Sequence, residues 1–368
     1  MYVESVEIRN FRNLRQLEIC FNKRYNYFYG KNAQGKTNII EAVSYLLSTK
    51  SHRETAVANL IHYDDTASVV MGQVIRKGVR DSVSFTLGED KKVFYLNRQK
   101  VLPSVLVERF GVVFFDPEDL RLIKDGPDKR RRYIDQLISN IHPPYRKAYR
   151  QYHHLLKQRN ALLKDPSVKE YGELFYIFDK QLAGLTKYII QKRLRYLKEI
   201  QTVAQKIHEG ITDEKERIGL KYQTNIIDEY EKIKDIEKIY LTLLKQNFVY
   251  DKERRTSLLG PHTDDILIEV NEKSARRFAS QGQQKTVSIS LKLSEVELYR
   301  IQKNVQPIVF LDDVMSELDE KRRRRLLSLL KEGQVFITAT DKIDQSDIDK
   351  DEIALFEVID GSVVQMDI

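Results

Sequence analysis

The segment that most constrains the fold is the turn GKNAQGKT, which begins at Gly30. It matches the pattern GxxxxGK(S/T) at every fixed position. The aromatic run RYNYFY precedes it, and the apolar, helix-like run TNIIEAVSYLL overlaps its end. A turn of this kind between a strand and a helix is typical of a phosphate-binding loop, because its glycines let successive backbone N–H groups face one anion. The sequence therefore predicts an α/β nucleotide-binding fold rather than an accidental glycine-rich turn.

The same loop and a second segment supply the residues that nucleotide chemistry requires. We expect Lys36 to bind the β- and γ-phosphate oxygens and the Thr37 hydroxyl to coordinate Mg²⁺. In PIVFLDDVMSELD, an apolar run ends at Asp312 and Asp313. We interpret Asp312 as the acid on the metal side and Asp313 as a group that can polarise an attacking water. The predicted cofactors are ATP and Mg²⁺, and the predicted phosphate-binding residues are Gly30, Lys31, Asn32, Ala33, Gln34, Gly35, Lys36 and Thr37.

A third motif, SQGQQKT, lies at the start of an apolar-periodic segment. Ser280, Gly282 and Gln283 fall at the expected N-terminus of this helix. A hydroxyl group and exposed N–H groups at such a position form an anion site, and ordinary capping of the helix by Ser280 is the alternative.

Strand-like patterns occupy both ends of the chain, and the middle is helical. Residues 67–102 have the pattern of a β-meander, with short alternating runs broken by glycine turns. From Pro127 onwards, apolar residues recur at helical spacing in four segments, of which the last begins near Asp228. Strand patterns return at SLLGPHTDDILIEV, and PIVFLDD and GQVFITAT resemble buried parallel strands.

This order predicts one α/β ATPase-like domain built from both ends of the chain, with a helical lobe inserted. We expect residues 1–123 to form its N-terminal part, with the phosphate loop and the meander. Residues 124–251 would form the helical lobe. Residues 252–368 would complete the ATPase domain with the SQGQQKT motif and the paired aspartates.

The charge balance suggests a polyanionic partner. Lys and Arg number 62 against 54 Asp and Glu, which gives a formal charge of +8 and a pI of about 9.1. Nucleic acid is the first candidate, and a merely solvated basic surface is the alternative. Because no helix-turn-helix or zinc-finger pattern occurs, we expect DNA binding that selects structure rather than sequence. The candidate contacts are Lys129, Arg130, Arg131, Arg132, Arg146, Lys147 and Arg150.

Cysteine usage and hydropathy exclude several other classes. Cys20 is the single cysteine, so an intramolecular disulfide and a multi-thiolate metal site are excluded. Its alternating apolar neighbours indicate a strand, in which we expect Cys20 to be packed. No apolar stretch approaches the length of a membrane span. We therefore expect a cytoplasmic protein without a membrane partner.

Taken in order, these motifs resemble the RecF family of bacterial recombination proteins, which are relatives of the SMC and ABC-type ATPases. YGKNAQGKTN is similar to the family's Walker A, SQGQQKT to its signature sequence, LDDVMSELD to its Walker B and D-loop, and VFITATD to its closing strand. The stretches FFDPEDLRLIKDGPDKRRRYID and LLGPHTDDI also resemble RecF rather than SMC proteins. The resemblance covers almost the full chain and implies an ABC-type P-loop ATPase domain.

The resemblance also implies a function. In ABC-type ATPases the signature motif faces the nucleotide of a second subunit, so Ser280, Gly282 and Gln283 would complete the site of a partner copy in an ATP-dependent homodimer. Members of the family bind gapped, single-stranded or junction DNA and hydrolyse ATP slowly in a DNA-stimulated way. With RecO and RecR they promote loading of RecA in DNA repair, replication and the SOS response.

Two positions depart from the general ABC pattern. Asp313 stands where many ABC ATPases carry a glutamate, and Thr340 or Asp341 occupies the region of the switch histidine. Both departures favour slow turnover. FDPEDL lies in the region of the Q-loop.

Two other classes of protein are the alternatives. A small-molecule NTPase or kinase would not need the SQGQQKT motif. An SMC-like structural protein would need a far longer insertion than residues 124–251 provide.

Overall fold

The structure is a computed structural model and describes residues 1–54, 56–88, 91–168, 170–212, 216–227, 234–330, 332–342 and 348–367. The chain divides into two compact units. The first unit contains residues 1–120 and 292–368, so both ends of the chain fold together, as predicted. The second unit contains residues 121–291.

The first unit contains a mainly parallel sheet with the order β15-β14-β3-β13-β12-β8. Its five strands from β14 to β8 are parallel neighbours, and only β15 runs antiparallel. All residues of β12 and β13 are buried, which explains their continuous apolar sequences. The strands are β3 (Tyr25–Tyr29), β8 (Val112–Phe115), β12 (Ile308–Asp312), β13 (Val335–Ala339), β14 (Ile353–Ile359) and β15 (Ser362–Met366).

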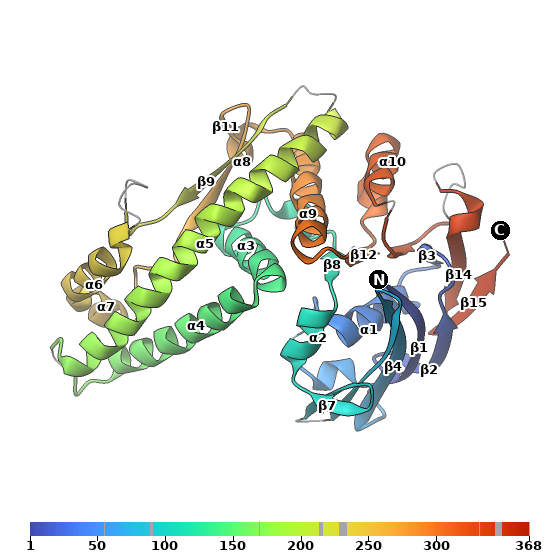
Figure 1. The fold of residues 1–368 in the computed structure, drawn as a ribbon, viewed down its shortest axis with the longest axis horizontal. Coiled ribbons are helices and arrows are strands. Elements are labelled where there is room, and N and C mark those ends of the chain that lie inside the picture. The colour runs from blue at the N-terminus through green and yellow to red at the C-terminus, as the bar shows by residue number, and fades with distance from the viewer. Residues whose placement is uncertain are drawn as a thin grey trace. The chain divides into compact units, whose positions relative to one another are not determined.

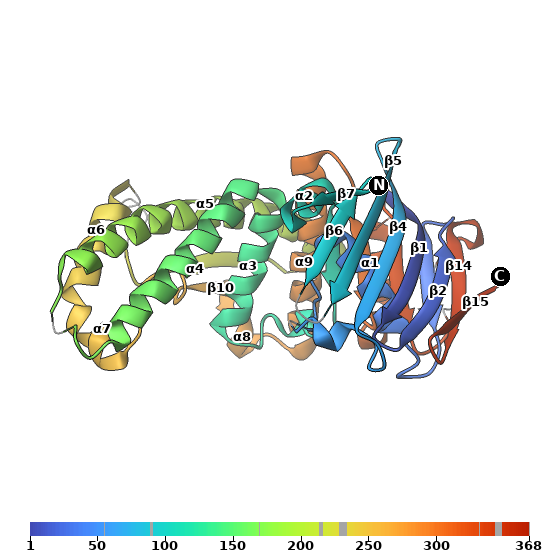
Figure 2. The same cartoon turned by 90° about the horizontal axis from the view of Figure 1, so that it is seen from below.

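A second sheet of the same unit is antiparallel and has the order β2-β1-β4-β5-β6-β7, and its strands lie side by side in Figure 2. The meander predicted at residues 67–102 corresponds to its last four strands. Helix α1 (Lys36–Ser48) packs against strands of both sheets, and one hydrophobic core joins them. The strands are β1 (Tyr2–Phe11), β2 (Leu14–Cys20), β4 (Ala67–Arg76), β5 (Val79–Gly88), β6 (Lys92–Leu96) and β7 (Gln99–Val101). Helices α2 (Pro103–Arg109) and α10 (Glu320–Leu329) also belong to this unit.

The second unit is mostly helical, and α4 and α5 run side by side in it (Figure 1). Helix α3 begins at Pro127, as predicted. The sequence predicts a fourth helix from about Asp228; residues 228–233 lie outside the described part, and the described helix α6 begins at Ile236. The helices are α3 (Pro127–Ile141), α4 (Pro143–Lys164), α5 (Glu173–Thr212), α6 (Ile236–Gln246) and α7 (Phe248–Arg254).

The second unit continues past residue 251, where the sequence placed the end of the helical lobe. It includes a small antiparallel sheet with the order β11-β10-β9, in which β9 (Ile218–Gln223) pairs along its whole length with β10 (Asp265–Val270). This pairing ties the segment after residue 251 to the lobe. The unit also contains β11 (Lys273–Ser274), α8 (Ala275–Phe278) and α9 (Gln281–Lys303) as far as Leu291. The SQGQQKT motif therefore belongs to this unit.

Buried ion pairs fasten the helices of the second unit to one another. Arg193 of α5 donates two hydrogen bonds to Asp135 of α3, at 2.9 and 2.8 Å. Arg159 of α4 bonds Asp179 of α5 and Asp251 of α7, each at 2.6 Å. Removing one partner of such a pair would leave an uncompensated buried charge, which is strongly destabilising.

In the described part of the chain, no helix is both long enough and apolar enough to cross a bilayer.

Candidate nucleotide-binding site

The phosphate loop connects β3 to α1 at the carboxyl edge of the parallel sheet. Gly30 and Gly35 adopt positive φ angles of 145° and 108°, which few other residues tolerate. Lys36 begins α1 and is 8% exposed. Its Nζ donates to the carbonyl oxygens of Gly30 and Lys31, at 2.7 Å each. Burial lowers the pKa of Lys36, and the carboxylates of Asp313 and Asp312 oppose that shift.

The two nucleotide motifs meet directly. The Thr37 hydroxyl donates a 2.7 Å hydrogen bond to Oδ1 of Asp312. Asp312 ends β12 and lies opposite Thr338 of β13, whose hydroxyl donates to the same oxygen at 2.7 Å. Strand β13 pairs in parallel with both β12 and β3, so the ends of β12 and β3 meet at one edge of the sheet and the acid of Walker B lies beside the hydroxyl of Walker A.

The buried position of Asp312 disfavours its ionised form. It is 7% exposed, and burial raises its pKa. The two hydroxyl donors and the Arg53 guanidinium lower that pKa, while Asp313 raises it further. A carboxylate held in this way gains most from a nearby cation.

The donor set fits Mg²⁺. The Thr37 hydroxyl and the Asp312 carboxylate are oxygen ligands, which Mg²⁺ prefers, and this ion ordinarily keeps water and phosphate oxygens as its remaining ligands. The described residues contain no group of three or more His, Cys, Asp or Glu side chains that could hold a metal.

Asp313 is oriented differently from its neighbour. Its φ angle is 52°, in the left-handed region, and its backbone N–H donates to the Thr338 hydroxyl at 3.0 Å. Its carboxylate accepts a 3.1 Å hydrogen bond from the Ser316 hydroxyl and is only partly buried. Asp313 can therefore reach solvent, as a group that polarises water must, and its role stays a prediction.

The remaining loop residues are either exposed to solvent or hydrogen-bonded to a neighbouring turn. Lys31, Asn32 and Ala33 are exposed, as expected for residues whose backbone faces a ligand. The Gln34 side chain accepts a 2.6 Å hydrogen bond from the Asp360 N–H. The Gln34 carbonyl accepts one from the Gly361 N–H at 2.9 Å. The turn between β14 and β15 therefore supports the loop.

Replacing Gly30 with alanine should destabilise this unit, because a Cβ atom there would lie 2.5 Å from the carbonyl oxygen of Val358. We expect the free energy of unfolding to fall by about 1–3 kcal/mol from the strained φ angle, plus a similar contribution from overpacking. Urea unfolding monitored by circular dichroism measures the change. Gly78→Ala is the matched control, because Gly78 also has a positive φ (78°) but a Cβ atom there meets nothing within 4 Å. Equal losses in the two variants would contradict the close approach to Val358.

The signature segment caps its own helix. The Ser280 hydroxyl accepts a 3.3 Å hydrogen bond from the Gln283 N–H, and Oε1 of Gln283 accepts one from the Ser280 N–H at 2.8 Å. This reciprocal pair is a capping box, so the capping alternative is realised. Because the Ser280 hydroxyl acts only as an acceptor in the capping box, its proton can still be donated to another group. Ser280 is also exposed. Gly282 and Gln283 are partly buried.

The basic residues of α3 differ in accessibility. Arg130 is 5% exposed and bonds both carboxylate oxygens of Asp265, at 2.8 and 2.9 Å, so its assignment as a DNA contact is corrected. Arg131 is partly buried and donates to the Asp264 carbonyl at 2.5 Å. Lys129 pairs with Asp125 at 3.3 Å.

The other residues predicted to contact DNA are more exposed to solvent. Arg132 of α3 and Lys147 and Arg150 of α4 are exposed, and within the described part of the chain none of them forms an ion pair. Arg146 of α4 is partly buried.

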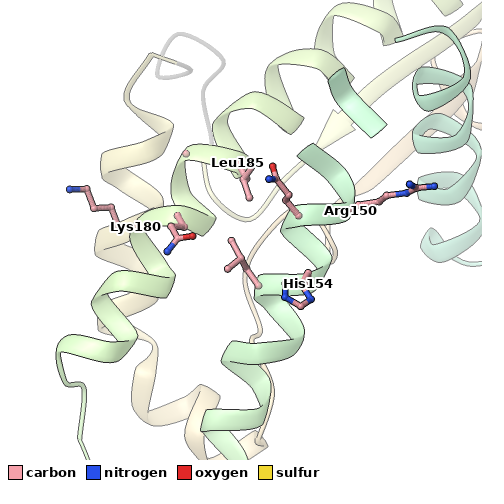
Figure 3. A pocket seen from close by; sticks show the side chains of 8 residues that line it. Arg150, His154, Lys180 and Leu185 are labelled. Carbon is pink, nitrogen blue, oxygen red and sulfur yellow. The ribbon is translucent and has the colours of Figure 1, made fainter. Parts of the chain in front are cut away.

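A surface groove of about 720 Å³ lies between α4 and α5 (Figure 3). In Figure 3 the side chains of Arg150 and Lys180 extend away from the groove in opposite directions. They do not form a clamp for a single anion. The groove is lined by Arg150, Gln151, His154, Leu155, Lys180, Gln181, Gly184 and Leu185.

Two residues near the site were not predicted. The Thr338 hydroxyl bonds both the Asp312 carboxylate and the Asp313 backbone N–H. The sequence feature that could have indicated this role is a hydroxyl residue within the otherwise apolar strand VFITA. The charge of Arg53 lowers the pKa of Asp312, and no sequence pattern relates the two residues.

Comparisons with known proteins agree with this geometry. The family model of the RecF/RecN/SMC N-terminal domain matches residues 2–352. A DNA replication and repair protein RecF from Clostridioides difficile is 36% identical over 100% of this chain and 99% of its own length. Its counterpart from Lactobacillus johnsonii is 38% identical over 93% of each chain.

Solved structures show the same relationship. A structure of the recombination mediator protein RecF with ATP, in the RecFOR pathway, has a TM-score of 0.90 and 33% identity over 99% of this chain and 97% of its own. An Smc head bound to the C-terminal winged-helix domain of ScpA has a TM-score of 0.57 and 15% identity over 100% of this chain and 98% of its own, which supports the ABC-type fold alone.

Proposed function

Because this chain belongs to the RecF family, we propose that it is an ATP-dependent DNA-binding protein that acts in DNA repair and replication. It binds gapped or junction DNA as a clamp and promotes RecA loading together with RecO and RecR. The observation that carries the proposal is the hydrogen bond between Thr37 and Asp312, because it joins Walker A and Walker B in one assembled nucleotide site. Footprinting on gapped duplex with and without ATP tests it, and protection that does not depend on ATP would contradict it.

The residues of the site have distinct tasks in nucleotide binding. Lys36 exchanges its bonds to the loop carbonyls of Gly30 and Lys31 for bonds to phosphate oxygens. Thr37 and Asp312 are the residues that would hold Mg²⁺, which when bound neutralises phosphate charge. The loop N–H groups and the N-terminus of α1 face the remaining phosphate oxygens.

Hydrolysis is slow in this proposal. Asp313 orients the attacking water and accepts its proton, and its side chain is one methylene shorter than the usual glutamate. No histidine follows β13 in the sequence, where Thr340 and Asp341 stand. The nucleotide therefore acts more as a clamp ligand than as a rapidly consumed substrate.

The active form is a homodimer closed by ATP. The proposal assigns Ser280, Gly282 and Gln283 to the γ-phosphate of the partner copy. An exposed Ser280 whose hydroxyl proton is available as a donor supports this assignment. A small-molecule kinase remains the alternative function, but it would have no use for these residues.

One face of α4 is the proposed DNA contact. This 22-residue helix contains no Asp or Glu. Lys147, Arg150, His154 and Lys157 recur at helical spacing and are all exposed. Such a stripe can follow a phosphate backbone without reading bases.

Replacing Arg132, Lys147 and Arg150 together with alanine should weaken binding to gapped DNA uniformly across sequences. If each contacts one phosphate, the slope of log K against log salt should become shallower by about 2–3, and affinity at low salt should fall about tenfold or more. Gel-shift titrations in rising salt measure both quantities. The control removes the same charge from the other unit, with Lys91, Arg98 and Lys100 changed to alanine. If the control loses as much affinity, net charge rather than α4 explains the binding.

A further inference from the structure

The side chain of Gln283 is held at both ends. Its Oε1 accepts the 2.8 Å hydrogen bond from the Ser280 N–H, and its Nε2 donates a 2.8 Å hydrogen bond to Oε1 of Glu216. The carboxylate of Glu216 cannot donate when ionised, so it binds only the NH₂ end of the amide. Glu216 therefore fixes which end of Gln283 faces the signature serine.

Glu216 is itself fixed by a buried histidine. Oε2 of Glu216 lies 3.1 Å from Nε2 of His208, and Nδ1 of His208 lies 3.1 Å from the Ser290 hydroxyl. Both His208 and Ser290 are fully buried. Burial lowers the pKa of His208, and the hydrogen bond with Glu216 opposes that shift. Because an ionised carboxylate can only accept, Nε2 of His208 is the donor to Glu216.

This chain of contacts links separate elements of the second unit. His208 lies in the last turns of α5, and Glu216 precedes β9. Ser290 and Gln283 both belong to α9. His208 of α5 thus contacts α9 at Ser290, and Glu216, which His208 holds, contacts α9 at Gln283 in its first turn, about two turns earlier.

We propose that Glu216 is a positioning residue for the signature motif, and that it holds Ser280 in place through Gln283. This inference rests on the proposed function, in which Ser280 binds the γ-phosphate of a partner copy. A charge-assisted hydrogen bond is stronger than a neutral one, so Glu216 is well suited to hold an amide in a single orientation. Without it, Gln283 can rotate and release the Ser280 N–H.

Glu216→Ala tests the proposal in the full-length protein. We expect nucleotide-dependent dimerisation, measured by sedimentation with ATPγS, to weaken about tenfold. The affinity of the monomer for a fluorescent ATP analogue should stay within about twofold of wild type, because Glu216 does not belong to the phosphate loop. Glu216→Gln should recover much of the loss, since its amide oxygen still accepts from Gln283. A merely structural role would instead lower the thermal midpoint and change both measurements.

A double-mutant cycle makes the test sharper. Gln283→Ala should lose at least as much dimerisation as Glu216→Ala, and the double variant should be no worse than Gln283→Ala alone, because Glu216 acts only through Gln283. Additive losses, or normal dimerisation of Glu216→Ala, would overturn the inference and leave the proposed function intact. If the wild type fails to dimerise with nucleotide, the proposed function fails, and the inference fails with it.

Discussion

Replacing Lys36 with alanine is expected to abolish measurable ATP hydrolysis and to weaken ATP binding by about 100-fold or more. The Lys36 ammonium lies within the phosphate loop, 2.7 Å from each of two loop carbonyls. The variant thus loses the cation that would neutralise the β- and γ-phosphates. Burial lowers the pKa of Lys36, so an anionic ligand that replaces the carbonyls strengthens its charged form. Titration with a fluorescent ATP analogue and a phosphate-release assay measure the two effects.

Lys31→Ala is the matched control for this prediction. Lys31 belongs to the same loop, but its side chain is exposed and only its backbone carbonyl contacts Lys36. We expect a change of less than about threefold in ATP affinity, of the size that a single solvent-exposed charge contributes. If Lys31→Ala weakens ATP binding as much as Lys36→Ala does, the phosphate contact is assigned to the wrong lysine.

Local patterns were sufficient to predict the elements that carry the nucleotide site. The positive φ angles at Gly30 and Gly35 are a requirement of the loop itself, so the motif predicts them without knowledge of the fold. Likewise, β12 and β13 occur where continuous apolar runs were found, because strands buried on both faces must be apolar throughout. The confirmed α/β fold follows from such short-range features.

Positions that depend on distant partners were not predicted. Arg130 lies in a run of four basic residues, yet the turn of α3 directs it inwards to Asp265, which is far away in the sequence. Cys20 was expected to be packed but is exposed, because it alternates with the inward-facing Leu17 and Ile19 and so lies on the other face of β2. The contact between Gln283 and Glu216 likewise joins segments that no local pattern relates.

Replacing Ser280 with arginine should eliminate nucleotide-dependent dimerisation and leave ATP binding by the monomer intact. The position is exposed, so the monomer can accommodate the longer side chain, and loss of the cap costs about 1 kcal/mol. In the dimer the same side chain would occupy the space meant for the partner's γ-phosphate. Ser280→Thr keeps the hydroxyl and is the control. Gel filtration with light scattering, with and without ATPγS, reports the oligomeric state.

Mixing the two defective variants distinguishes a shared site from a self-contained one. In a heterodimer of Lys36→Ala with Ser280→Arg, the intact phosphate loop of one chain meets the intact signature of the other, so one composite site is complete. We therefore expect the mixture to recover part of the dimerisation and DNA-dependent hydrolysis that each variant lacks alone. A protomer that encloses its own nucleotide predicts no recovery, because every chain in the mixture carries a defect. Absence of recovery at protein concentrations where the wild type dimerises would thus refute the two-chain site, even if both single variants behave as expected.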